Sequence, residues 1–241
     1  MARLILGLQP VREAVRVHGA RLEKVMVERD PSPRLEAVAR FATDRGATVT
    51  TVTRGDLDRL SGGVRHQGVA AFAPELLLHS LDRVEVGPAT ALVALDGVMD
   101  PQNFGAVIRS AVALGATGVL WAEHASAPLT PSTFRASAGA VEHAVLYRVR
   151  SMPGALEDLA ARGVISIALD AAGDVTIDDL DLKQPICLVI GAEDKGARKS
   201  VRRACAFTAR LPMTGAIASL NASVAGAVAL YEVARQRRHG G

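Results

Sequence analysis

One segment near the C-terminus constrains this chain most, because a bent loop runs directly into a long apolar helix. Residues 211–232 have the sequence LPMTGAIASLNASVAGAVALYE. Pro212 and Gly215 bend the loop, and Ser219 and Asn221 stand at the predicted helix start. Ser and Asn commonly cap helices, a contribution of about 1 kcal/mol each, because their oxygens accept bonds from unpaired backbone N–H groups. A capping role and a role in a binding site are both open for these two side chains.

Two further segments have a related layout, in which a strand-like run enters a polar loop that contains glycine. They are LDGVMDPQNFGAVIRSAVALGATG at 95–118 and LVIGAEDKG at 188–196. Short, nearly continuous apolar runs are typical of buried strands. The chain has such runs at 91–95, 118–122, 164–169 and 186–190. Strands and helices alternate from residue 91 onward, which predicts a parallel sheet covered by helices on both faces. Ligands bind beyond the carboxyl ends of such strands, so we expect the polar loops at one edge.

The N-terminal third has a different organisation. Its patterns predict helices at about 9–17 and 34–44 and strands at 24–28, 47–52 and 68–73. We therefore expect a small α/β domain over residues 1–73. Residues 74–90 begin with Pro74, contain Pro88 near their end, and keep neither a helical nor a strand period for long. This indicates a linker to a second domain over 91–241.

Charge is distributed unevenly along the chain. Residues 1–73 carry 12 Lys and Arg against 8 Asp and Glu, whereas the whole chain has 28 against 25. A positive excess favours contact with a polyanion such as RNA, and Arg12 and Arg65 are the candidate phosphate contacts in this third. The alternative is a nucleotide-composition bias toward Arg codons, since only four of the 28 basic residues are Lys.

Several classes of protein are disfavoured. No apolar run approaches the roughly 20 residues that span a bilayer, and the first residues lack the features of a signal peptide, so we expect a cytoplasmic protein. Cys187 and Cys205 form neither a metal-type pair nor a disulfide framework, and Cys187 in an apolar strand indicates a small buried side chain. No His cluster or Asp-x-Asp pattern predicts a metal. The 191–196 loop has the glycine spacing of a P-loop, but Ala197 and Arg198 replace the required Lys and Ser/Thr.

The order and spacing of the three segments resemble the motifs of the SPOUT superfamily of S-adenosylmethionine-dependent RNA methyltransferases. The resemblance covers residues 91–241 and is to the branch that methylates the ribose 2′-hydroxyl. In the N-terminal part, ILGLQPVREAV and VRHQGVAA resemble the branch that acts on 23S ribosomal RNA. The resemblance implies a parallel-sheet catalytic domain with a C-terminal trefoil knot, preceded by a small α/β domain of L30e-like fold that binds RNA. It also implies a homodimer.

The resemblance implies roles for individual residues. Arg109 would be the catalytic residue, Asn103 would help to hold it, and Glu193 would orient the site. For the cofactor, the backbone at Gly191 would approach the methionine moiety, the backbone around Leu211 and Leu220 would contact adenine and ribose, and Met213 would line the pocket. Ser219 and Asn221 would form hydrogen bonds near Arg109. Arg135 would contact an RNA phosphate. Because Arg is always protonated at pH 7, an electrostatic role for Arg109 is safer than proton abstraction. Asn103 also stands where a helix N-cap is expected.

The implied activity is 2′-O-methylation of RNA, with a guanosine of 23S ribosomal RNA as the expected target. A related enzyme that acts on transfer RNA, or on ribosomal RNA to confer antibiotic resistance, is one alternative. An RNA-binding or ribosome-assembly protein that keeps the fold without the activity is another. The N-terminal domain argues against the transfer RNA enzymes, which typically lack it. In one departure from the ribosomal branch, Gly7-Leu8-Gln9 replaces its frequent Gly-x-His.

Overall fold

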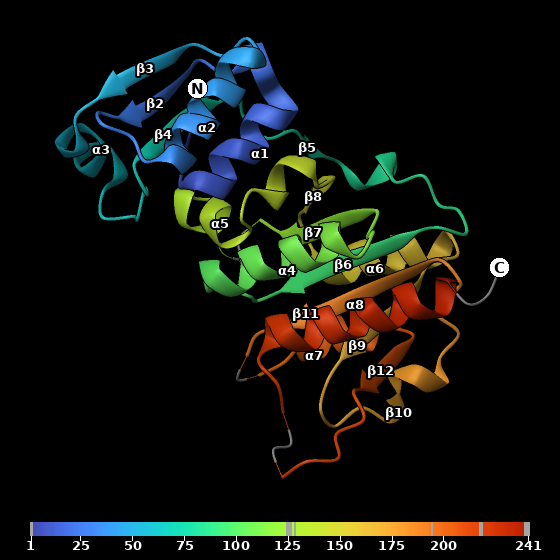
Figure 1. Ribbon diagram of the computed structural model, residues 1–241. Coiled ribbons are helices and arrows are strands. Elements are labelled where there is room, and N and C mark those ends of the chain that lie inside the picture. The colour runs from blue at the N-terminus through green and yellow to red at the C-terminus, as the bar shows by residue number, and fades with distance from the viewer. Residues whose placement is uncertain (1, 124–126, 128, 194, 217–218, 239–241) are drawn as a thin grey trace. The chain divides into compact units, whose positions relative to one another are not determined.

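A computed structural model describes residues 2–123, 127, 129–193, 195–216 and 219–238. The chain packs into two compact units (Figure 1). The first unit comprises residues 1–76 together with 129–143, and the second comprises 77–128 and 144–241. These units are defined by packing, and the functional boundaries at residues 74 and 90 stay a prediction.

The first unit is built on a four-stranded sheet with the strand order β1-β4-β2-β3. Its strands are β1 (Arg3–Leu6), β2 (Lys24–Glu28), β3 (Val49–Val52) and β4 (Val69–Ala73). β4 runs antiparallel to β1 and β2, whereas β2 and β3 are parallel. Its helices are α1 (Leu8–His18), α2 (Pro33–Asp44), α3 (Arg54–Ser61), α5 (Pro131–Ala136), and the 3-10 turns η1 (Gly19–Arg21) and η3 (Ala140–His143). The small α/β fold predicted here is confirmed.

Within residues 1–73, the strand β1 and the helix α3 are absent from the sequence prediction. β1 has only four residues, too few to display a period, and it pairs with β4 at the sheet edge. α3 contains Gly55 and begins with a capping box, in which the Thr53 hydroxyl accepts from the Asp56 backbone N–H and the Asp56 carboxylate accepts from the Thr53 N–H. The cap supplies the local stability that the apolar pattern of this short helix does not provide.

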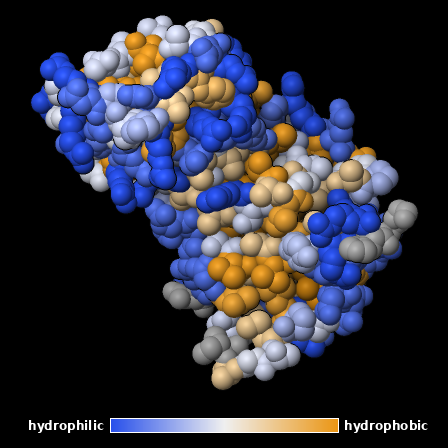
Figure 2. Space-filling model, in the orientation of Figure 1, coloured by the Kyte–Doolittle hydropathy of each residue, from blue (hydrophilic) through white to orange (hydrophobic). Residues whose placement is uncertain are grey.

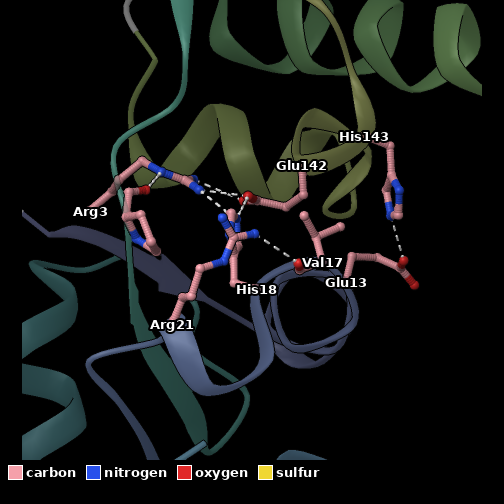
Figure 3. A network of polar contacts seen from close by, with 8 residues as sticks. Arg3, Glu13, Val17, His18, Arg21, Glu142 and His143 are labelled. Atoms are coloured by element: carbon pink, nitrogen blue, oxygen red, sulfur yellow. Dashed lines mark hydrogen bonds and ion pairs between the residues drawn. The ribbon is translucent and has the colours of Figure 1, made fainter. Parts of the chain in front are cut away.

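Residues 129–143 are joined to the first unit by a buried ionic cluster (Figure 3). The Glu142 side chain is only 1% exposed and accepts from Arg3 Nη1 at 2.8 Å and Nη2 at 2.6 Å. His18 Nε2 lies 2.8 Å from the same carboxylate. His143 Nε2 lies 2.9 Å from a Glu13 oxygen beside it. The segment with Arg135 therefore packs with the N-terminal part of the chain.

The second unit is built on a parallel sheet whose described strands follow the order β10-β12-β9-β11-β6-β7-β8-β5. They are β5 (Leu78–His79), β6 (Ala91–Asp96), β7 (Gly118–Ala122), β8 (Leu146–Val149), β9 (Ile165–Leu169), β10 (Val175–Thr176), β11 (Ile186–Gly191) and β12 (Phe207–Arg210). All four strands expected from continuous apolar runs are present. The expected parallel α/β architecture is confirmed.

Helices cover both faces of this sheet. α4 (Pro101–Ala113) and α8 (Ala222–Arg238) pack side by side on one face (Figure 1). α6 (Met152–Ala161) and α7 (Lys199–Ala204) pack against each other, and they share an apolar cluster with the other face. Val189 of β11 belongs to that second cluster, whereas Ile190 contacts α8 at Gly226. Successive side chains point to opposite faces of a strand, so a strand covered on both sides is apolar at every position.

Part of the segment expected to be a linker belongs to the sheet. β5 pairs in parallel with β8, and the 3-10 turn η2 (Leu81–Arg83) follows it. Arg162 of the second unit donates to the carbonyl oxygens of Leu81 and Val84. A two-residue strand gives no periodic signal, which is why the sequence does not reveal it. η4 (Ile177–Asp179) completes the described elements of this unit.

Cys187 is fully buried in β11, and burial raises the pKa of its thiol. Burial also raises the pKa of Cys205 to about 12. Both thiols are therefore neutral near pH 7, and the interpretation of Cys187 as a small buried side chain is confirmed. Among the described helices, none combines the length and apolarity needed to cross a bilayer.

Candidate active site

A pocket of about 720 Å³ lies at the carboxyl ends of neighbouring strands in the second unit. β9, β11 and β12 end in Leu169, Gly191 and Arg210, and all three residues line it. The lining also includes Glu193, Leu211, Met213, Ser219 and Leu220. This size lies within the 300–1,000 Å³ range typical of small-molecule sites. The polar loops of the segments 188–196 and 211–232 therefore meet at one sheet edge, as expected.

Glycine is required where β11 enters its loop. A Cβ atom at Gly191 would lie 1.9 Å from the Ala197 nitrogen and 2.0 Å from the Gly196 carbonyl carbon. The loop folds back tightly, because Ala192 and Gly196 exchange two backbone hydrogen bonds of 3.2 and 2.8 Å. The backbone of this loop therefore forms the pocket wall directly.

An ion pair fixes the far end of the same loop. The Asp96 carboxylate, fully buried at the end of β6, accepts from the Arg198 backbone N–H at 2.8 Å and from Arg198 Nε at 2.9 Å. Hydrogen bonding to Asp96 raises the pKa of Arg198. Asp96 is absent from the candidates predicted above, although a carboxylate at the last position of an apolar strand is a signal for such a residue.

The segments 95–118, 188–196 and 211–232 meet at a cluster of two amides and one carboxylate. Asn103 Nδ2 and Asn221 Nδ2 both donate to Glu193 Oε1, the latter at 2.6 Å. Asn221 Nδ2 also lies 3.1 Å from Asn103 Oδ1, to which it donates. Three segments separated by 28 to 118 residues therefore converge on one carboxylate. Asn103 and Asn221 border the pocket through Glu193 and are not part of its lining.

The helix caps differ from expectation at one position. The expectation that Asn103 caps α4 is wrong, because Asp100 accepts from the Gln102 N–H at 3.1 Å and the Asn103 N–H at 3.2 Å. Pro101 then occupies the first helical turn. Capping by Asp100 leaves the Asn103 amide available to Glu193.

Asn221 caps α8, which is one of the two roles that the sequence left open, and it also contacts Glu193 of the pocket. Its Oδ1 accepts from the backbone N–H groups of Ser223 at 2.9 Å and Val224 at 3.3 Å, as a cap of α8 does. Its Nδ2 is the donor to Glu193 described above. One side chain thus joins the start of α8 to the loop after β11.

The side chains of Arg109 and Ser219, the other catalytic candidates, have open hydrogen-bonding capacity. Arg109 is exposed on α4 and makes no hydrogen bond or ion pair with any described residue. Ser219 is exposed, lines the pocket and likewise has no hydrogen-bond partner within the described ranges. The structure therefore leaves the roles of Arg109 and Ser219 as predictions.

The pocket has further polar residues that the sequence analysis did not select. Asp170, directly after β9, pairs with Arg202 at 2.6 Å, and both line the pocket. Arg210, the last residue of β12, donates to the Gly173 carbonyl at 2.8 Å. A polar residue at or after the end of a predicted strand is again the available signal.

The RNA-contact candidates all lie in the first unit. Arg12 is exposed on α1, Arg65 is exposed in the loop before β4, and Arg135 is half-buried on α5. His66 is buried in the turn before β4 and accepts a hydrogen bond from the Gly68 N–H, which is a structural role. Within the part of the chain that the structure describes, no group of three or more His, Cys, Asp or Glu side chains could hold a metal ion.

A parallel sheet with a pocket at its carboxyl edge, walled by closely approaching backbone, defines an α/β protein that binds a small molecule. The chain belongs to the SpoU rRNA Methylase family, whose model matches residues 90–231. A second model, described as RNA 2′-O ribose methyltransferase substrate binding, matches residues 4–77. The protein is thus an RNA methyltransferase by family, with an N-terminal substrate-binding domain.

Known proteins support this assignment over the whole chain. An uncharacterized tRNA/rRNA methyltransferase of Mycobacterium avium is 42% identical over 97% of this chain and 77% of its own length. The crystal structure of the SpoU methyltransferase AviRb from Streptomyces viridochromogenes, in complex with the cofactor AdoMet, has a TM-score of 0.81 at 31% identity and covers 100% of this chain and 92% of that one. A structure concerned with 2-OH methylation of C/U34 on tRNA has a TM-score of 0.55 at 31% identity and covers 62% of this chain and 97% of that one.

Proposed function

We propose that this protein transfers a methyl group from S-adenosyl-L-methionine to a ribose 2′-hydroxyl of RNA, in the cytoplasm. The observation that carries the proposal is the pocket at the ends of β9, β11 and β12, bordered by the cluster of Asn103, Glu193 and Asn221. The full-length similarity to AviRb, which binds AdoMet, supports the same cofactor here.

The pocket suits this cofactor in shape and in charge. The wall at Gly191 has no room for a side chain, so backbone groups there can approach a ligand closely. We assign Leu211 and Leu220 to the adenosine part and Met213 to the pocket lining, and all three line the pocket. Glu193 is held by neutral amides, and no cation of the described residues pairs with it. Its negative charge favours a ligand with a positive sulfonium and ammonium group.

Bound S-adenosylmethionine would supply an electrophilic methyl group, so the protein has to position the hydroxyl and stabilise the charge that develops on its oxygen. We assign the second task to Arg109, an exposed cation with no partner among the described residues. Ser219 and Asn221 would orient the ribose, and Asn103 would hold the rim in place. A fixed cation acts here without taking a proton.

For the substrate we propose a guanosine of 23S ribosomal RNA, gripped by the N-terminal domain. The match of residues 4–77 to a substrate-binding model supports an RNA contact in that domain, and Arg12, Arg65 and Arg135 are the phosphate contacts we assign. The structure concerned with tRNA covers only 62% of this chain, which disfavours the transfer RNA alternative. An enzyme that confers antibiotic resistance through ribosomal RNA is still a candidate.

We also propose a homodimer that forms through α8. Val224, Val228 and Tyr231 are exposed on this helix at helical spacing. Figure 2 shows an orange patch over this part of the second unit. Exposed apolar patches commonly mark protein interfaces. We expect Val228→Glu to convert a dimer into a monomer in sedimentation equilibrium, whereas a wild-type chain that sediments as a monomer would contradict the dimer.

Two experiments test the proposed function. Isothermal titration with S-adenosylmethionine should show saturable binding, while an RNA-binding protein without activity should show no heat. Reverse-transcription stops at low dNTP, mapped on ribosomal and transfer RNA from cells with and without this protein, should reveal one lost stop at a guanosine of 23S RNA. Stops that change only in transfer RNA would contradict the substrate assignment.

A further inference from the structure

The first unit holds a cavity of its own, of about 490 Å³. It is formed by the end of β2, by α3 and by the loop 62–68. The polar residues that line it include Glu28, Arg54, Asp58, Arg65 and Gln67. Its volume falls within the range of small-molecule sites, and a single nucleotide is a ligand of that size.

Glu28 gives this cavity a carboxylate with open acceptor capacity. The side chain, at the end of β2, is 21% exposed, and no described residue donates a hydrogen bond to it. Arg54 Nη1 lies 4.0 Å from Oε2, which is too long for a hydrogen bond. A Cβ atom at Gly68 would lie 2.5 Å from Glu28 Oε1, so only glycine at position 68 leaves the carboxylate in this place.

The wall around Glu28 is fixed by its own hydrogen bonds. His66 Nδ1 accepts from the Gly68 N–H at 3.0 Å, and His66 Nε2 lies 2.9 Å from Asp58 Oδ1. Gln67 Oε1 accepts from the Leu8 N–H at 3.1 Å, which joins the loop to the start of α1. A cavity whose wall is already ordered loses little conformational entropy when a ligand enters.

The chemistry of this cavity favours one nucleobase. An ionised carboxylate only accepts hydrogen bonds, and its two oxygens can accept from two adjacent donors. Guanine has two adjacent donors, N1–H and the N2 amino group, on its Watson–Crick edge. Adenine and cytosine place an acceptor beside their amino group, and uracil has one N–H between two carbonyl groups. Arg54 adds a guanidinium that is 76% exposed, and such planes stack on unstacked RNA bases.

We propose that this cavity binds the guanine base of an unstacked RNA nucleotide, with Glu28 accepting from its Watson–Crick edge and Arg54 and Arg65 contacting the base and phosphate. The assignment rests on the proposed function, because it takes RNA as the substrate. It adds a base-reading site in the first unit, whereas methyl transfer belongs to the pocket of the second unit. A protein with such a site selects RNA by the identity of one base as well as by charge.

The test uses the full chain and fluorescently labelled ten-nucleotide RNAs in an anisotropy titration. The RNAs are oligouridine with one central guanosine, inosine or adenosine. Inosine lacks the N2 amino group, so the guanosine RNA should bind about tenfold more tightly than the inosine RNA. Tenfold corresponds to about 1.4 kcal/mol, within the range that a good bidentate contact provides. Glu28→Gln should abolish this preference. Glu36→Gln on α2 changes the net charge equally and should keep it, because Glu36 lies outside the cavity lining.

The inosine comparison needs no variant, so it decides the question even if Glu28→Gln fails to fold. Equal binding of all three RNAs by the wild-type chain would overturn the inference. Guanosine monophosphate alone tests the other source of the base, and a Kd as low as that of the guanosine RNA would overturn the assignment to RNA. Methyl transfer is measured separately on ribosomal RNA. Methyl transfer without a binding preference for the guanosine RNA would contradict this inference alone. A binding preference without methyl transfer would contradict the proposed function alone.

Discussion

Two carboxylate clusters, one in each unit, join distant parts of the chain in opposite ways. In the first unit Glu142 is 1% exposed, and Arg3 and His18 occupy both of its oxygens. In the second unit Glu193 is exposed and held by two neutral amides, both on Oε1. Its Oε2 has no partner among the described residues. The first cluster is thus closed and compensated in charge, whereas the second is open.

We propose that this difference separates a structural cluster from a functional one. A buried carboxylate with cationic partners holds segments together, and losing one partner leaves a buried charge. A carboxylate held only by amides is positioned while its charge stays available to a ligand. Arg109 and Ser219, which also lack partners among the described residues, extend the open cluster into a candidate active site.

Removal of the closed cluster should have the largest effect on stability. Glu142→Ala leaves Arg3 without its buried partner, which typically costs about 3–5 kcal/mol. Denaturant unfolding measures this loss. Glu36→Ala, which removes an exposed i,i+4 pair with Arg40, should cost less than about 1 kcal/mol. Equal losses in the two variants would show that the cluster of Figure 3 is not structural.

Removal of the Arg109 side chain, which has no partner among the described residues, should have the largest effect on catalysis. Arg109→Ala should lower single-turnover methyl transfer by about 10²–10³-fold, the usual loss for one group that stabilises developing charge. S-adenosylmethionine affinity should stay the same, as calorimetry can verify. Arg109→Lys keeps the charge but not the planar fork, and should retain an intermediate rate. Full transfer by either variant would remove Arg109 from the catalytic residues.

Neutralising the open carboxylate should weaken cofactor binding and leave folding intact. Glu193→Gln keeps an acceptor for the two amides but removes the negative charge. We expect S-adenosylmethionine to bind about tenfold more weakly, or about 1.4 kcal/mol, with unfolding free energy little changed. Glu157→Gln, an equal charge change at an exposed position of α6, is the control. A large loss of stability in Glu193→Gln would mean that this cluster resembles the closed one.

Removal of a purely local contact should have the smallest effect on stability. Thr53 caps α3, and Thr53→Ala removes the acceptor for the Asp56 N–H. The expected loss is about 1 kcal/mol in denaturant unfolding, well below that of Glu142→Ala. A loss as large as that of Glu142→Ala would undermine the distinction between local caps and long-range clusters.

The sequence predicts the architecture well where strands are buried on both faces. The runs at 91–95 and 186–190 correspond to β6 and β11, a central pair of the sheet, and β11 ends at the pocket. It misses β1, β5 and α3, which are short and held by an edge pairing or a cap. Such elements depend on contacts with distant segments or on one capping pair, so periodicity does not detect them.

For the site, motif resemblance goes further than pattern. All four cofactor candidates line the pocket, and Asn103, Glu193 and Asn221 meet in one cluster. The sequence does not reveal that Asp96 pairs with Arg198 beyond the loop of Gly191, or that residues 129–143 pack in the first unit. Each depends on a pairing that only the folded chain defines. The trefoil knot stays a prediction from the resemblance.

The central claim is that the open rim transfers a methyl group to a ribose 2′-hydroxyl. The most direct measurement uses S-adenosylmethionine with a labelled methyl group and ribosomal RNA, followed by complete alkaline hydrolysis. A 2′-O-methylated ribose blocks cleavage of the adjoining phosphodiester, so the label should appear in alkali-stable dinucleotides. Label found in mononucleotides, which reports base methylation, or no label in RNA at all, would contradict the account.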